Sequence, residues 1–267
     1  MVKNKLSIGV CIGPDTDRRT ITGCLFSIVY RMNKDNPVEV ITIGQSELIL
    51  DIVQTLPELW SLLPHMKRLD FDESLKKGWI TRKKNLMVQA ATHENILLIH
   101  DYYRLSPTFL SVFENVEQDF DILQPRIITK EGARHSDWIV DPKWLHGIMT
   151  REIAQKHMEI APTENHPVYV CGVPYNNTDL NHLLYVSGGL ILAKKKVLLD
   201  VPLPETHCWG DAEDLEWSKN LHKSRKSFKM NKNLIMSCDK SHKWNVREMP
   251  QSTIDLLLEK YPKPLYK

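Results

Sequence analysis

The chain opens with a strand, a helix and a second strand, and this order constrains the fold more than any other feature. An apolar run from Leu6 to Ile12 is followed by the turn Gly13-Pro14-Asp15, a helical pattern from Arg19 to Met32, and a strand from Val38 to Ile43. Neighbouring parallel strands need a crossover connection, which is usually a helix. We therefore expect an α/β fold with a mainly parallel central sheet flanked by helices.

The same alternation continues along the chain. It predicts these further elements: helix Leu48 to Leu63, interrupted by Pro57; strand Lys67 to Phe71; helix Thr81 to Ala91; strand Asn95 to Ile99; strands at Ile122 to Gln124, Trp138 to Val140 and Val168 to Cys171; an apolar run Val186 to Ala193; helices Lys194 to Leu199 and Leu215 to Ser224; and a strand around Leu234 to Met236. The pattern contains no internal repeat, and at 267 residues the chain fits one large domain or two small ones.

Ligands of open α/β sheets lie outside the carboxyl ends of the strands. The first strand is followed by Gly13 to Asp17, the second by Gly44-Gln45, and the strand that ends at Ile99 by His100 to Tyr103. We therefore expect these three segments to surround one crevice.

Composition excludes several classes of protein. The 35 basic and 33 acidic residues leave a formal net charge of only +2, which does not favour a nucleic-acid partner. The five cysteines are odd in number and lack CxxC spacing, so neither a disulfide framework nor a zinc ribbon is expected. No apolar run reaches membrane-spanning length, and residues 1–5 lead straight into a strand pattern. We expect a soluble protein of a reducing compartment, the cytoplasm, without a transmembrane segment.

The segment from Trp209 to Trp217 places four carboxylates between two large aromatic rings. An indole offers a flat apolar face on which a sugar ring can stack, and a nearby carboxylate can accept a hydroxyl proton. The alternative is an acidic first helical turn, favoured by the helix dipole, with both rings packed. The segment thus predicts either a carbohydrate site or an ordinary helix start.

A divalent metal is suggested where the strand before His100 ends. Asp101 stands in the position where a carboxylate would hold Mg²⁺ or Mn²⁺, and His100 is an alternative ligand. Far along the chain, Asp239 and His242 follow another predicted strand, and His242 would complete a carboxylate–imidazole pair with Asp101. The alternatives are an Asp101 that caps a helix before Pro107 and a His242 with a purely structural role.

A basic segment opens the helix that precedes the Asn95 to Ile99 strand. Arg82, Lys84 and Asn85 lie near the free N–H groups of this helix, where a phosphate would be bound favourably. The alternative is an exposed basic first turn, although cations there oppose the helix dipole.

Taken in order, these motifs resemble a GT-A fold glycosyltransferase, most closely the inverting family 2 type. The resemblance covers Leu6 to Trp244. It relates the Gly13 turn to the nucleotide-binding start, His100-Asp101-Tyr102 to the Asp-x-Asp metal motif, and Trp209-Gly210 through Glu213-Asp214 to the acceptor motif. The chain departs from that family in having a single carboxylate, Asp101, at the metal motif.

Further assignments follow from the resemblance alone. It implies one Rossmann-like GT-A domain over residues 1–250, with a nucleotide-binding half (1–105), an acceptor-binding half (106–250), and a C-terminal helix and tail (251–267). It also implies Mn²⁺ or Mg²⁺ as cofactor. The residues expected to bind substrate or nucleotide are Gly13, Asp15, Gln45, Arg82, Lys84, Asn85, Ser187, Gly188, Gly189, Trp209 and Gly210.

The implied activity is transfer of a sugar from a nucleotide donor, most plausibly a UDP-sugar, to a hydroxyl of a saccharide or glycoconjugate. Asp214 would act as the general base, Glu213 would hold donor or acceptor hydroxyls, and one displacement would invert the anomeric carbon. Two alternatives stay open. One is a binding protein of the same fold without activity, which the missing second carboxylate favours. The other is a sugar nucleotidyltransferase, which the acidic turn after Gly13 disfavours.

Overall fold

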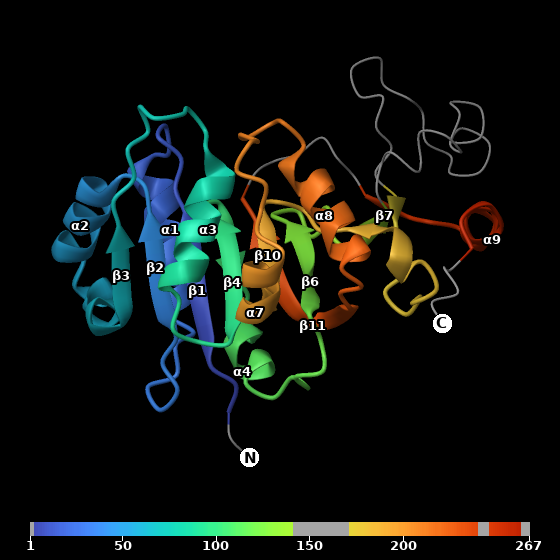
Figure 1. Ribbon diagram of the computed structural model, residues 1–267. Coiled ribbons are helices and arrows are strands. Elements are labelled where there is room, and N and C mark those ends of the chain that lie inside the picture. Colours follow the sequence, from blue (N-terminus) through green and yellow to red (C-terminus); the bar gives the residue numbers. More distant parts are fainter. Residues whose placement is uncertain (1–2, 141–170, 240–245, 263–267) are drawn as a thin grey trace.

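The computed structural model describes residues 3–140, 171–239 and 246–262. An eight-stranded sheet forms the centre of the molecule, and a four-stranded sheet lies beside it (Figure 1). No helix in these ranges has the length and hydropathy needed to cross a membrane.

One half of the central sheet is the predicted parallel unit. Its strands are β1 (Leu6–Cys11), β2 (Glu39–Ile43), β3 (Met66–Leu69) and β4 (Asn95–His100), in the spatial order β3-β2-β1-β4. The connections contain α1 (Arg18–Val29), α2 (Ser46–Thr55), the 3₁₀ helix η1 (Pro57–His65) and α3 (Ile80–Ala90). The prediction of a mainly parallel sheet flanked by helices is therefore confirmed.

The other half of this sheet is mixed. Next to β4 lies the antiparallel strand β10 (Leu190–Lys194), followed by β6 (Ile122–Thr129), β11 (Phe228–Cys238) and β5 (Tyr103–Leu105). β6 and β11 are parallel to each other, whereas β5 runs antiparallel to β11 at the edge. The strand β5 was not expected, and β6 and β11 are longer than predicted.

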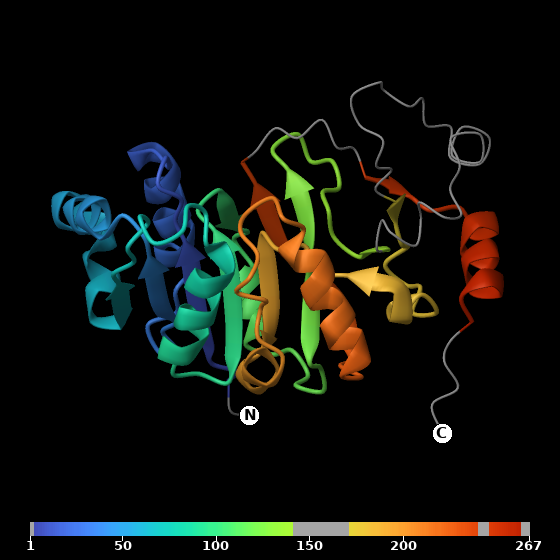
Figure 2. The same ribbon diagram turned by 45° about the horizontal axis from the view of Figure 1, so that its top comes forward.

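Two apolar cores sandwich the central sheet because successive strand residues point to opposite faces. Leu97 and Ile99 of β4 face the core formed with α1, α2, η1 and α4 (Phe109–Phe113). Ile96 and Leu98 face the core formed with α3, α7 (Lys195–Asp200) and α8 (Glu213–Lys223). Figure 2 shows α3, α7 and α8 together on the near face of the sheet.

A smaller sheet extends the molecule beyond β11. It contains β12 (Arg247–Glu248), β8 (Cys171–Gly172), β7 (Ile139–Val140) and β9 (Leu184–Tyr185), with the short 3₁₀ helix η2 (Asn181–Leu183) before β9. The final helix, α9 (Gln251–Lys260), buries Ile254 and Leu257 in the same core as α3 and α8. The predicted strand Val168 to Cys171 lies largely outside the described residues.

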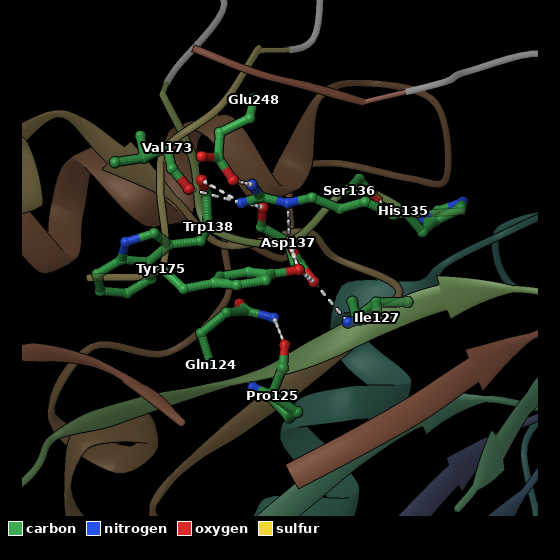
Figure 3. A network of polar contacts seen from close by, with 11 residues as sticks. Gln124, Pro125, Ile127, His135, Ser136, Asp137, Trp138, Val173, Tyr175 and Glu248 are labelled. Carbon is green, nitrogen blue, oxygen red and sulfur yellow. Dashed lines mark hydrogen bonds and ion pairs between the residues drawn. The ribbon is translucent and has the colours of Figure 1, made fainter. Parts of the chain in front are cut away.

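A buried polar network joins the small sheet to the central one (Figure 3). The carboxylate of Asp137, which is fully buried, accepts hydrogen bonds from Ile127 N of β6 (2.5 Å), Arg134 Nε (2.7 Å) and Tyr175 Oη (3.1 Å). The Arg134 guanidinium lies 4.2 Å from the centre of the Tyr175 ring and donates to Val173 O (2.8 Å). These bonds fix the segment between β6 and β7 against the chain that follows β8.

Candidate active site

The loops at the carboxyl ends of β1 and β4 meet, as the register of the parallel strands requires. Cys11 of β1 pairs with His100 of β4, so the residues that follow each strand lie side by side. Asp101 is buried, and its Oδ2 accepts hydrogen bonds from Gly13 N (3.3 Å) and Thr16 Oγ1 (2.5 Å). Two of the three predicted crevice segments are therefore in direct contact.

Gln45 brings in the third segment. Its side-chain amide donates to Thr16 O (3.1 Å) and to Gly13 O. The preceding Gly44 has a φ of +91°, and a Cβ there would lie 2.6 Å from Ile12 O, so only glycine fits. The loop from Gly13 to Asp17 is thus held by the side chains of Gln45, after β2, and Asp101, after β4. Asp15, at the tip of this loop, is exposed.

The Ser187-Gly188-Gly189 turn joins this edge to α8. His100 N donates to Gly189 O (3.1 Å), and Gly188 N donates to Asp214 Oδ2 (2.9 Å). A Cβ on Gly188 would lie 3.0 Å from Glu213 Oε1, and one on Gly189 would lie 3.0 Å from Tyr103 Oη. The turn therefore packs closely against the acid pair and the tyrosine, and a side chain at either glycine would require these neighbours to shift.

The acid pair begins α8. Asp214 is half-buried, and its Oδ1 accepts a hydrogen bond from Leu215 N (2.9 Å). Glu213 is 6% exposed, and burial raises the pKa of its carboxyl, an effect that nearby Lys84 opposes. Carboxylates in the first turn of a helix also interact favourably with the helix dipole.

Lys84 lies behind the turn and not in the crevice. Its side chain is 1% exposed, and Nζ donates to Gly188 O at 2.6 Å. Burial lowers the pKa of Lys84, while the charges of Glu213 and Asp214 act in the opposite sense. Lys84 thus fixes the Gly188 turn, and this turn binds the carboxylate of Asp214.

The other predicted members of the basic segment also have protein partners. Arg82 Nη1 lies 3.1 Å from both carboxylate oxygens of Glu205. Asn85 donates to Leu203 O (2.9 Å) and Glu205 Oε1 (2.9 Å) and accepts from Leu203 N (3.1 Å). That Arg82 and Asn85 bind phosphate stays a prediction. Their contacts show that they attach residues 203–205 to α3.

The two tryptophans of the acidic segment have different environments. Trp209 is 66% exposed, and its backbone N–H donates to Gly78 O (2.8 Å). Trp217 is fully buried, and its Nε1 donates to Val201 O (2.7 Å). Gly210, with a φ of +90°, follows the exposed ring. Trp209 is therefore the exposed ring of the two, whereas Trp217 is a core residue.

The described residues do not assemble a metal site. His100 is buried, and its Nδ1 lies 2.9 Å from Tyr102 Oη. No group of three or more His, Cys, Asp or Glu side chains with metal-binding geometry occurs in the described ranges. His242 lies outside them. The set present at this edge, Asp101 and His100, does not by itself fit a divalent ion.

Sequence reasoning missed Arg104, a residue of the unexpected strand β5. Its guanidinium donates to Asp101 O (2.7 Å) and Thr20 O (3.0 Å) and forms an ion pair with Asp239 (2.5 Å). A Cβ on Gly23 would lie 2.8 Å from Arg104 Nη2, which explains a glycine inside α1. Arg104 therefore connects the end of β4, the end of β11 and α1, and the mid-helix glycine was the only sequence signal for it.

Lys83, which lies between Arg82 and Lys84 in the basic segment, also has protein partners. Its Nζ donates to Ile12 O (2.9 Å) and forms an ion pair with Glu73. This buried cation supports the floor of the Gly13 loop.

Neither protein-family models nor curated protein sequences match the chain. Its structure is similar to that of S. aureus TarS 1-349 in complex with UDP-GlcNAc, with a TM-score of 0.56, 14% identity, and coverage of 90% of this chain and 60% of that one. It is also similar to GalNAc-T7 with UDP, GalNAc and Mn²⁺, with a TM-score of 0.59, 11% identity, and coverage of 97% and 48%.

A third similar structure is the mannosyltransferase PcManGT from Pyrobaculum calidifontis in complex with GDP-Man and Mn²⁺, with a TM-score of 0.53, 10% identity, and coverage of 91% and 59%. The chain thus spans 48% to 60% of these three proteins. At such low identities the similarity concerns the fold. The chain has the GT-A fold of glycosyltransferases.

Proposed function

We propose that this protein transfers a sugar from a nucleotide-sugar donor to a hydroxyl of a saccharide or glycoconjugate. The observation that carries the proposal is the contact chain from the end of β4 to α8. His100 N bonds to Gly189 O, and Gly188 N bonds to Asp214 Oδ2 at 2.9 Å. This chain places an acidic helix start beside the strand ends, where ligands of α/β sheets bind.

The proposed donor is a UDP-sugar, bound across the ends of β1 and β4. Two of the similar structures contain UDP-GlcNAc or UDP, and a third contains GDP-Man. The Gly13 to Asp17 loop, closed by Gln45, is the proposed contact for the base. Exposed backbone and Asp15 at the loop tip leave room for polar contacts with the ribose.

In the proposed reaction, Asp214 takes the proton of the acceptor hydroxyl while that oxygen attacks the anomeric carbon. The bond from this carbon to the diphosphate oxygen breaks, and its electron pair leaves with the UDP. One displacement inverts the anomeric configuration. Glu213 orients sugar hydroxyls, and the exposed Trp209 ring supports the acceptor by stacking.

Lys84 has a positioning role in this proposal. It fixes Gly188, whose N–H binds Asp214, and its positive charge favours ionised carboxylates at the start of α8. Removing a buried cation from beside two acids would raise the cost of keeping the base charged.

We also propose a divalent ion, Mn²⁺ or Mg²⁺, as cofactor. Two similar structures contain Mn²⁺. In this chain the ligands would be Asp101 and His100, with His242 lying outside the described residues, and the described set does not fit an ion alone. The proposed steps are therefore carried by protein groups.

The test is a set of thermal-shift and hydrolysis measurements with UDP, GDP, UDP-GlcNAc and GDP-Man, each with Mn²⁺ and with EDTA. A ligand present at about 100 times its dissociation constant stabilises the folded state by about 2.7 kcal/mol, which gives a clear rise in melting temperature. We expect the uridine nucleotides to produce this rise and UDP-GlcNAc, or another UDP-sugar, to be hydrolysed slowly. Absence of both stabilisation and hydrolysis with every nucleotide would contradict the proposal.

A second candidate function is a nucleotide-sugar binding protein of the same fold. The single carboxylate in the segment that follows β4 favours it, together with the absence of any group of three or more candidate metal ligands among the described residues. Calorimetric binding of a UDP-sugar without hydrolysis or transfer to any acceptor would favour this alternative. A sugar nucleotidyltransferase would instead release UTP from the nucleotide sugar and pyrophosphate.

A further inference from the structure

A pocket of about 460 Å³ lies beside the C-terminal half of α1, at the β5 edge of the central sheet. Its walls come from the C-terminal half of α1, from β5 and the residues that follow it, and from β6 and β11. Neither the acid pair nor the Gly188 turn lines it. None of the proposed steps uses this pocket.

The pocket carries a positive charge that no described residue neutralises. Arg31 and Arg104 line it, and no carboxylate does. Arg104 is ion-paired with Asp239, whereas none of the ion pairs within residues 3–140, 171–239 and 246–262 includes Arg31. An anion bound in the pocket would therefore pair with the positive charge of Arg31.

Two polar atoms of the lining residues also lack a hydrogen-bond partner. Arg31 Nε and Ser106 Oγ are both buried and unpaired. Leaving a buried donor without a hydrogen-bond partner destabilises the folded state. Arg31 and Ser106 both line the pocket, and a guanidinium and a hydroxyl match the several acceptor oxygens of a phosphate group.

An aromatic surface adjoins these donors. The rings of Phe26 and Tyr30 stack at 5.4 Å with an interplanar angle of 22°, and Tyr30 is 62% exposed. Such a surface offers a planar contact for a ring on the ligand. Arg104, packed against Gly23, makes the wall between this surface and the candidate active site.

We infer that this pocket binds a phosphate monoester that carries a planar ring. Arg31 and Ser106 hold the phosphate, and the Phe26–Tyr30 pair contacts the ring. The site is separate from the proposed donor site, because its lining includes neither the Gly13 loop nor α8.

Phenyl phosphate is the probe for isothermal titration of the full chain, with inorganic phosphate and phenol as the two halves of the ligand. We expect phenyl phosphate to bind with a dissociation constant of about 1 mM or tighter, and each half to bind at least about tenfold more weakly. No binding of phenyl phosphate at about ten times that concentration would overturn the inference, and so would equal binding of inorganic phosphate.

Three variants locate the binding. Arg31→Met should weaken phenyl phosphate binding at least about tenfold, because it removes the unmatched charge, and Tyr30→Ala should weaken it about threefold or more. Arg18→Met is the matched control, since Arg18 lies on the same helix but pairs with Asp51 away from the pocket. Unchanged binding in Arg31→Met, or equal loss in Arg18→Met, would assign the probe to another site and overturn the inference. Melting temperatures of the variants show whether each is folded.

Discussion

Asp137 and Glu213 are both buried carboxyl groups, yet their surroundings differ in one respect. Burial raises the pKa of both, and a neighbouring cation, Arg134 or Lys84, opposes that rise. Arg134 donates directly to Asp137, which also accepts from Ile127 N and Tyr175 Oη. Lys84 instead donates to Gly188 O. No other described residue donates a hydrogen bond to the carboxylate of Glu213.

This difference separates a structural acid from a candidate functional one. A buried polar group whose acceptor sites are filled contributes rigidity and stability. A perturbed carboxyl with unused acceptor sites, placed beside a partly exposed partner such as Asp214, is typical of binding and catalytic sites. Asp137, in the network of Figure 3, accepts several hydrogen bonds, and this separates it from Glu213 at the start of α8.

The largest expected effect is on the rate of sugar transfer. Asp214→Asn should lower the rate about 10²- to 10⁴-fold, because an amide cannot take the proton of the acceptor hydroxyl. The amide oxygen can still accept from Gly188 N, so the turn and the UDP affinity should be preserved. Steady-state rates and UDP titration measure the two effects.

Glu216→Gln is the control from the same helical turn. Glu216 lies near Lys219 (3.7 Å) and has no contact with the Gly188 turn, so the variant should retain near wild-type activity. A loss in Glu216→Gln as large as that in Asp214→Asn would show that the charge of the whole segment matters, and not one base.

The next effect is on stability. Asp137→Asn should lower the free energy of unfolding by about 3–5 kcal/mol, because it leaves the buried Arg134 with only the exposed and more distant Glu248 (3.9 Å) as an anion among the described residues. Urea denaturation measures the change. Asp119→Asn, which removes a surface partner of Lys229, should leave the unfolding midpoint nearly unchanged. An Asp137→Asn variant as stable as the wild type would contradict the structural role of Asp137 that separates it from Glu213.

A smaller effect is expected on the KM for the acceptor, through the exposed ring of Trp209. Trp209→Ala should raise the KM for the acceptor about fivefold, equivalent to about 1 kcal/mol of lost stacking. Trp60→Ala is the matched control, since Trp60 is also exposed but lies on η1. An equal KM in Trp209→Ala and the wild type would exclude the ring from acceptor binding.

The smallest effect concerns pH. Burial raises the pKa of Glu213 above its ordinary value of 4.5, so the folded state favours the protonated form. The wild type therefore loses stability as the pH rises through this raised pKa, whereas Glu213→Gln carries no charge to bury. The stability of Glu213→Gln relative to the wild type should increase from pH 4.5 upwards and then level off, as measured by melting temperature. A constant difference across this range would contradict the raised pKa.

Much of the fold could be predicted because long apolar strands and crossover helices carry strong patterns. β1, β2 and β4 match the predicted strands to within one residue at each end. The strand β5 could not be predicted, because three residues are too few to show a period. The prediction for β6 ended at Gln124, because proline lacks the N–H that a strand donates. Pro125 is accommodated because it lies at the irregularity in the pairing of β6 with β11.

The candidate site was predicted in part. The order of motifs correctly brought Asp101, the Gly188 turn and the Glu213-Asp214 pair to one place. Lys84 was expected in the crevice but lies beneath it, because sequence position on a helix start does not reveal which side chain faces inward. Arg104 could not be found, since its role depends on the backbone carbonyls of Asp101 and Thr20 and on the carboxylate of Asp239, which lie in three separate segments.

The most direct test of the central claim is proton NMR of the product formed from an α-linked UDP-sugar in the first turnovers. A single displacement with Asp214 as base predicts a β-linked product in the wild type and none in Asp214→Asn. An α-linked product, or undiminished transfer by Asp214→Asn, would contradict the assignment of α8 as the catalytic element.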